Sequence, residues 1–173
     1  TWLKETLDAG ELGDVLYLNC RRVNLGKVRS DENAMWSLAP HDISVVLHLL
    51  GDMPSHVCAQ GFTYLQSQAG IEDVVFLTLN FADGRAAQIH VSWLDPHKKR
   101  QLTVVGSRQM VTFDDMEATE KIRVYDKGVD VSQALAEAPA YASYGDLLTL
   151  RNGDVRIPRV AMREPLRALC EHF

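Results

Sequence analysis

The chain has 173 residues, of which 46% are hydrophobic and 24% charged, and its formal net charge at pH 7 is −5. This composition is typical of one globular domain with a substantial core. No apolar run approaches the ~20 residues of a membrane-spanning helix, and the acidic balance argues against a nucleic-acid surface. We therefore expect neither a membrane nor a nucleic acid as a partner.

The N-terminal third begins with a helical pattern up to about Ala9, which Gly10 and Gly13 interrupt. The segment 14–24 alternates in the manner of a strand, and the polar segment 25–35 is typical of a loop. This loop leads directly into the most distinctive stretch of the sequence, residues 36–51. Loops that enter a helix are common places for binding groups.

Residues 36–51 predict a helix that is buried over much of its circumference. Ser37 is a suitable N-cap, Pro40 is tolerated in a first turn, and Gly51 is a natural stop. The imidazole of His41 is then expected in the first turn of a packed helix.

Beyond Gly51 the period changes to that of strands. An Asp-Gly pair at Asp83 and Gly84 predicts a hairpin turn. The expected strands are 55–65, 72–81, 85–94, 101–105, 110–113, 121–125 and 146–151. Their short connections favour antiparallel neighbours.

The C-terminal third contains an expected loop or loose helix at 129–144 and a helix at 164–173. The whole pattern predicts an α+β fold. Its sheet is open and largely antiparallel, with about six to eight strands. One buried helix packs on one face, and helical pieces lie at both ends.

Several chemical signatures are absent from the sequence. It contains no G-x-G-x-x-G, no phosphate-binding G-x-x-x-x-G-K-[ST] and no G-x-S-x-G. The six histidines show no H-x-x-x-H spacing, so we expect no metal site. Cys20, Cys58 and Cys170 are odd in number and far apart, which favours reduced thiols and a cytoplasmic protein.

The chain resembles the C-terminal substrate-binding domain of the Gfo/Idh/MocA oxidoreductases. The matching motifs run in order along nearly the whole chain: 7–13 (LDAGELG), 24–26 with Arg29, 36–42 (WSLAPHD), 72–73, 92–94 followed by Pro96, Lys98 and Arg100, 105–107, 114–116, 164–166 and 172–173. Within the family, the motif at 36–42 is most similar to that of nucleotide-sugar dehydrogenases acting at C3 of UDP-N-acetyl-glucosaminuronic acid.

The resemblance implies an NAD(P)-dependent dehydrogenase acting on a sugar or nucleotide sugar. It also implies a preceding dinucleotide-binding domain, which would hold NAD or NADP and a catalytic lysine. Residues 1–173 would then be the C-terminal domain of a longer dehydrogenase, inactive and without cofactor on its own. Helical patterns at both ends of the sequence agree with this expectation. Family members commonly associate through the open sheet, so we expect a homodimer or homotetramer.

His41 is the main catalytic candidate. Oxidation of an alcohol requires a group that accepts the hydroxyl proton, and imidazole suits this task near neutral pH. A first-turn position would also disfavour the imidazolium, because the helix dipole is positive there. The alternative is a histidine that only caps or packs. The resemblance favours the catalytic role.

Two neighbours of His41 bear on that role. The family usually has an aspartate one turn earlier, where this chain has Ser37. A serine can bond the substrate or cap the helix, but it supplies no charge, which leaves the activity of the parent enzyme open. Asp42 is a candidate substrate ligand, although a first-turn carboxylate favoured by the dipole is the alternative that we prefer.

The remaining substrate-binding candidates are Arg22, Asn24, Arg29, Asn33, Trp36, Lys98 and Arg100. The first four lie in the strand and loop before the helix and could bind hydroxyls, a carboxylate or a diphosphate. Lys98 and Arg100 share one side of an extended segment and could meet an anion. Solvated surface charge is the alternative for all of these charged groups, and packing is the role that we prefer for Trp36 and Trp93.

Two functional hypotheses follow. The first is the substrate-binding part of an NAD(P)-dependent sugar dehydrogenase. The second is a non-catalytic dimerisation or ligand-sensing domain derived from that family, in which Ser37 records a lost activity.

Overall fold

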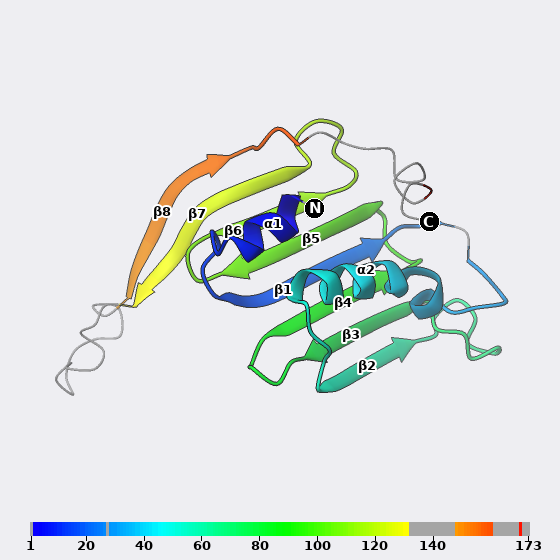
Figure 1. The fold of residues 1–173 in the computed structure, drawn as a ribbon. Helices are drawn as coiled ribbons and strands as arrows, with labels where there is room; N and C mark the ends of the chain where they lie inside the picture. Colours follow the sequence, from blue (N-terminus) through cyan, green and yellow to red (C-terminus); the bar gives the residue numbers. More distant parts are fainter. Residues whose placement is uncertain (1, 27, 132–147, 161–169, 171–173) are drawn as a thin grey trace.

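The chain folds into two layers, a sheet and a pair of helices. The structure is a computed structural model that describes residues 2–26, 28–131, 148–160 and 170. In this part of the chain α1 (Trp2–Asp8) and α2 (Ala34–Leu50) lie on one face of an eight-stranded sheet (Figure 1). The expected α+β class with an open, largely antiparallel sheet is confirmed. None of the described helices is long and apolar enough to cross a membrane.

The sheet has the order β2-β3-β4-β1-β5-β6-β7-β8. Its strands are β1 (Val15–Val23), β2 (His56–Phe62), β3 (Val74–Asn80), β4 (Ala86–Ser92), β5 (Lys99–Gly106), β6 (Met110–Asp114), β7 (Ile122–Val131) and β8 (Leu148–Arg156). All neighbours are antiparallel except β1 and β4. The first strand is therefore inserted in the middle of the sheet, between two strands that follow one another in sequence.

The local signals proved sound for the central strands. The predicted turn at Asp83 and Gly84 joins β3 to β4, with the Phe81 N–H donating to the Arg85 carbonyl at 2.9 Å and Gly84 at φ +90°. β7 and β8 are both longer than the predicted strands 121–125 and 146–151. β7 extends to Val131, into the predicted loop 129–144, and β8 extends to Arg156. The helix expected at 164–173, with its motifs 164–166 and 172–173, lies outside the described residues apart from Cys170.

The core lies between the sheet and α2. Side chains that face α2 alternate along the central strands, as Leu18 and Cys20 on β1 and Leu102 and Val104 on β5 show; all four are at most 6% exposed. The same register holds on β3 and β4, where buried apolar residues such as Leu79 lie on the helix side.

The opposite face of the sheet, which we call the outer face, carries mixed side chains. Tyr17 is 48% exposed and Phe76 39% exposed there. Phe76 stacks on His90 with ring centroids 4.5 Å apart. Trp93, expected as a packing residue, belongs instead to the core and is only 3% exposed.

Candidate functional site

A small hollow opens beside His41, where α2 passes over the end of β1 and the start of β5. Its volume is about 100 Å³. The residues that line it are Arg22, Val23, Asn24, Leu38, His41, Lys98, Lys99 and Arg100. Five predicted site residues from three separate segments of the sequence therefore meet in one place: His41, Arg22, Asn24, Lys98 and Arg100.

The helix that carries His41 begins earlier than the sequence suggested. Its N-cap is Asn33, whose side-chain oxygen accepts a hydrogen bond from the Trp36 N–H at 3.0 Å. The Asn33 amide nitrogen also donates to Glu72 at 2.9 Å, so a contact distant in sequence fixes the cap. The predicted N-cap at Ser37 is wrong for this reason. Pro40 lies inside the helix, on an exposed part of its surface, rather than in the first turn.

This shift changes the electrostatic argument for His41. The imidazole follows the start of the helix by seven residues, about two turns, whereas the effect of the helix dipole falls off within the first turn. The expectation that His41 lies in the first turn, where the helix dipole acts, is therefore wrong. His41 is exposed and lines the hollow, so its ring is accessible to a bound molecule.

Asp42 and Arg22 bind each other. The Arg22 Nε lies 2.7 Å from Asp42 Oδ2, and Nη2 lies 3.2 Å from Oδ1, which is a two-point ion pair. Asp42 is only 7% exposed and lies beyond the first turn of the helix, so the predicted dipole role is also wrong. The pair connects α2 to β1 next to His41, and it leaves the Nη1 of Arg22 free of Asp42.

The start of β5 supplies the other cations. Arg100 Nη1 lies 3.5 Å from Asp115 Oδ2, and the same carboxylate also binds Lys121 at 3.2 Å. Lys98 is exposed and has no side-chain partner within the described part of the chain. Lys99, which was not among the predicted site residues, also lines the hollow.

Besides Asp42, four predicted site residues do not line the hollow. Arg29 pairs with Asp31 and Glu32 at 2.8 and 2.9 Å, and these contacts raise its pKa. Asn33 serves as the helix cap. Trp36, expected to pack, is instead 69% exposed. Ser37 is one helical turn before His41, so the two side chains neighbour each other on the helix surface.

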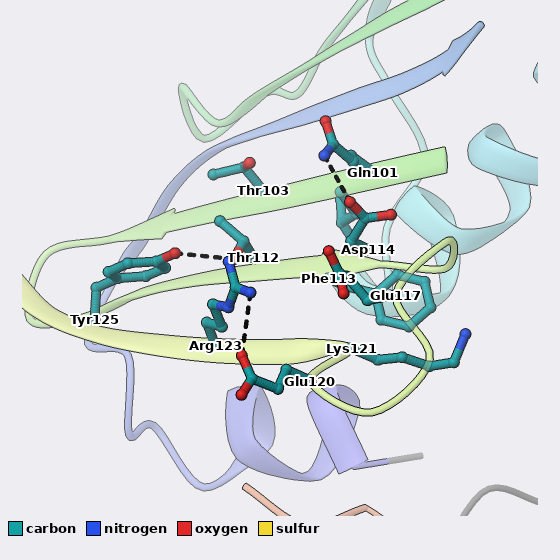
Figure 2. Close-up of a pocket in the computed structure, with 11 residues that line it drawn as sticks. Gln101, Thr103, Thr112, Phe113, Asp114, Glu117, Glu120, Lys121, Arg123 and Tyr125 are labelled. Carbon is teal, nitrogen blue, oxygen red and sulfur yellow. Dashed lines mark hydrogen bonds and ion pairs between the residues drawn. The ribbon is translucent and has the colours of Figure 1, made fainter. Parts of the chain in front are cut away.

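A second hollow, of about 210 Å³, lies on the outer face over β5, β6 and β7. Figure 2 shows that its polar groups turn toward one another, with Arg123 between Tyr125 and Glu120 and Gln101 directed at Asp114. Because these groups satisfy one another, we assign no ligand to this hollow. His41 belongs to the other side of the sheet.

The remaining reactive groups near His41 are few. Cys20 lies beneath Asp42, and burial, followed by the effect of the Asp42 charge, raises the pKa of its thiol to about 12. Such a thiol is a core residue rather than a nucleophile. Among the described residues no cluster of histidine, cysteine and acidic side chains could hold a metal ion.

Comparison with known proteins identifies the family. The model of the GFO/IDH/MocA C-terminal domain matches residues 1–112 of this chain. The chain belongs to this family. Its fold is thus that of the C-terminal domain of an oxidoreductase family. None of the curated proteins matches the sequence significantly.

Solved structures of GFO/IDH/MocA proteins share this fold. UDP-N-acetylglucosamine 3-dehydrogenase GnnA from Acidithiobacillus ferrooxidans is 21% identical with a TM-score of 0.66, over 98% of this chain and 50% of that one. An inositol dehydrogenase homolog from Azotobacter vinelandii, complexed with NADH and myo-inositol, is 12% identical with a TM-score of 0.67, over 92% and 39%. WlbA dehydrogenase from Bordetella pertussis, in complex with NADH and UDP-GlcNAcA, is 17% identical with a TM-score of 0.58, over 70% and 40%. The matched region thus covers half the length of GnnA and about 40% of the length of each of the other two proteins.

Proposed function

We propose that this domain is the substrate-binding part of an NAD(P)-dependent oxidoreductase that oxidises a hydroxyl group of a sugar or nucleotide sugar. The observation that carries the proposal is the hollow itself. An accessible imidazole, His41, lines it together with Arg22, Asn24, Lys98 and Arg100. Family membership and the described substrates of the structurally similar proteins from A. ferrooxidans and B. pertussis support it.

In this proposal His41 accepts the proton of the substrate hydroxyl as that carbon is oxidised. The Asn24 amide and the N–H groups of Arg22 bind neighbouring sugar oxygens and fix the ring relative to the imidazole. Ser37, one turn earlier on α2, supplies a hydroxyl for a further hydrogen bond. The ion pair of Arg22 and Asp42 holds the helix, and thereby His41, in place over β1.

The hollow at His41 is too small for a whole dinucleotide. Ligand pockets usually enclose about 300–1,000 Å³, whereas this hollow measures about 100 Å³. The sequence also lacks a G-x-G-x-x-G turn that could hold a pyrophosphate. We therefore assign no cofactor-binding residue to this chain and derive no step through NAD(P). We propose that a separate dinucleotide-binding domain completes the site.

The test is a His41→Asn substitution in the intact protein that contains this domain. We expect kcat to fall by about 10²- to 10⁴-fold, the usual contribution of one acid–base group, while cofactor binding is retained. His48→Asn is the matched control, because His48 is also exposed and lies two turns further along the same helix. Unchanged turnover in the His41 variant would remove the proton-acceptor role and favour the second candidate.

The second candidate is a non-catalytic dimerisation or ligand-sensing domain. The observation that favours it is Ser37, which stands where the family usually has an aspartate. In that case the full-length protein should bind sugars without oxidising them. A screen of sugars and nucleotide sugars, with absorbance at 340 nm as the readout for reduced cofactor, separates the two candidates.

We further propose that two copies associate through the outer face of the sheet. Members of the family commonly associate through the open sheet, and Tyr17 and Phe76 are partly exposed on this face. Sedimentation equilibrium should show a dimer or tetramer, and Phe76→Glu should shift it toward monomer. A wild-type protein that remains monomeric at about 100 μM, well above the Kd of stable dimers, would contradict this.

A further inference from the structure

The hollow at His41 carries a concentration of positive charge. Four cationic residues line it, Arg22, Lys98, Lys99 and Arg100, and no acidic residue is among the described residues that line it. The chain as a whole has a formal net charge of −5. Positive charge is thus gathered at this one place against the overall balance of the protein. A concave surface lined by one sign of charge attracts ligands of the opposite sign.

The strand register makes this arrangement costly for folding. Arg22 on β1 is paired directly with Arg100 on β5, and both face the helix side of the sheet. Like charges directly opposite each other on neighbouring strands destabilise a sheet. Asp42 and Asp115 offset the repulsion from outside the hollow. Asp115 is shared with Lys121, so the compensation at Arg100 is incomplete.

Lys98 adds to the uncompensated charge. It immediately precedes β5, two residues before Arg100. Its ammonium group has no partner among the described side chains, and it lines the same hollow as the imidazole of His41. A free lysine beside a partly compensated arginine is the arrangement that binds an oxyanion.

We infer that the substrate carries an oxyanion, a carboxylate or a phosphate, on the same sugar unit whose hydroxyl group meets His41, and that Lys98 and Arg100 bind this oxyanion. The second part rests on the position of the groups. His41, Lys98 and Arg100 line the same small hollow, so one unit of a ligand can meet the imidazole and both cations. That unit is a sugar acid or a sugar phosphate. The inference rests on the proposed function for the role of His41, but not for the binding of the anion.

Isothermal calorimetry on the intact protein tests the inference with four probes: D-glucuronate, D-glucose 6-phosphate, D-glucose and inorganic phosphate. We expect at least one of the two charged sugars to bind about tenfold more tightly than glucose, the usual gain from a hydrogen bond between charged groups. It should also bind more tightly than inorganic phosphate. Preference for glucuronate identifies a carboxylate, and preference for glucose 6-phosphate identifies a phosphate.

Variants locate the effect. Lys98→Gln and Arg100→Gln should each weaken the binding of the charged sugar about tenfold and leave glucose unchanged. Arg123→Gln is the matched control, because its side chain is 40% exposed, like the 43% of Arg100, but lies on the outer face. It should bind the charged sugar as the wild type does.

Three results would overturn the inference: equal binding of glucose and the charged sugars, including no binding of any; equal binding of inorganic phosphate; or unchanged affinity in both variants. The proposed function is tested separately. The His41→Asn variant should still bind the charged sugar. If this variant turns over normally while the protein still prefers the charged sugar to glucose, only the proton-acceptor role is refuted. If His41→Asn lowers turnover as expected but the protein does not prefer the charged sugar, only the inference about the oxyanion is refuted.

Discussion

The ion pair between Arg22 and Asp42 gives the most direct test of how the site is built. The Asp42→Asn substitution keeps the shape of the side chain but leaves the Arg22 charge without its counter-ion. Breaking a fully buried pair costs about 3–5 kcal/mol, whereas an exposed pair contributes about 0.2–1 kcal/mol. The side chain of Asp42 is 10% exposed to solvent and that of Arg22 is 21% exposed. The loss should therefore lie nearer the buried limit.

We expect the free energy of unfolding to fall by about 2–3 kcal/mol, less than the buried limit because water still reaches Arg22. For a chain of this length the melting temperature should fall by roughly 4–12 °C. Urea titration monitored by circular dichroism measures the loss, with an unchanged m-value showing that the change lies in stability. The double variant with Arg22→Gln should be less destabilised than the sum of the single variants.

Arg29→Gln is the control for this experiment. Arg29 also pairs with carboxylates, but its side chain is 46% exposed. It should therefore lose less than about 1 kcal/mol. If Asp42→Asn loses no more than this control, the pair does not hold α2 to the sheet, and the positioning argument for His41 fails.

Two further predictions concern titratable groups. Burial raises the pKa of the Cys20 thiol to about 12. In a variant with Cys58→Ser and Cys170→Ser, Cys20 should therefore not react with a thiol reagent at pH 8 until urea unfolds the protein. Rapid reaction of the folded protein would refute the burial of Cys20. The pKa of His90 is lowered below its usual 6.5 by burial and then by Arg21, so the unfolded state binds the proton more readily. His90 should therefore lower the free energy of unfolding as the pH falls below about 6.5, and it should not change this free energy above that pH. An NMR titration of the folded protein should give His90 a midpoint below that of histidine in the unfolded chain. In His90→Gln the free energy of unfolding should depend less steeply on pH.

The sequence alone predicted the fold class and most of the central elements. Period-two patterns and the Asp83-Gly84 turn report interactions between residues close in sequence, so they are readable without a fold. The start of α2 was misplaced because Ser37 is a suitable cap residue, whereas the helix is capped by Asn33. Glu72, which accepts a hydrogen bond from Asn33, lies 39 positions away in the sequence. No local signal contains that contact.

The candidate site shows the same division. The sequence identified His41, Arg22, Asn24, Lys98 and Arg100 as chemically suitable residues, but it also proposed Arg29 and Asn33, which have structural partners of their own. Polar residue type and spacing do not reveal whether a side chain is already paired. Likewise, the sequence placed Asp42 beside His41 but gave no sign that it binds Arg22.

What the sequence determined by itself is which residues can form strands, helices and turns, because those preferences depend on a few neighbouring side chains. The tertiary structure decided that β1 lies between β4 and β5, which sets Arg22 opposite Arg100 and both beneath α2. That order depends on which distant strands bury the most apolar surface against one helix. The charge gathered around His41 is therefore a property of the folded sheet and of no single segment.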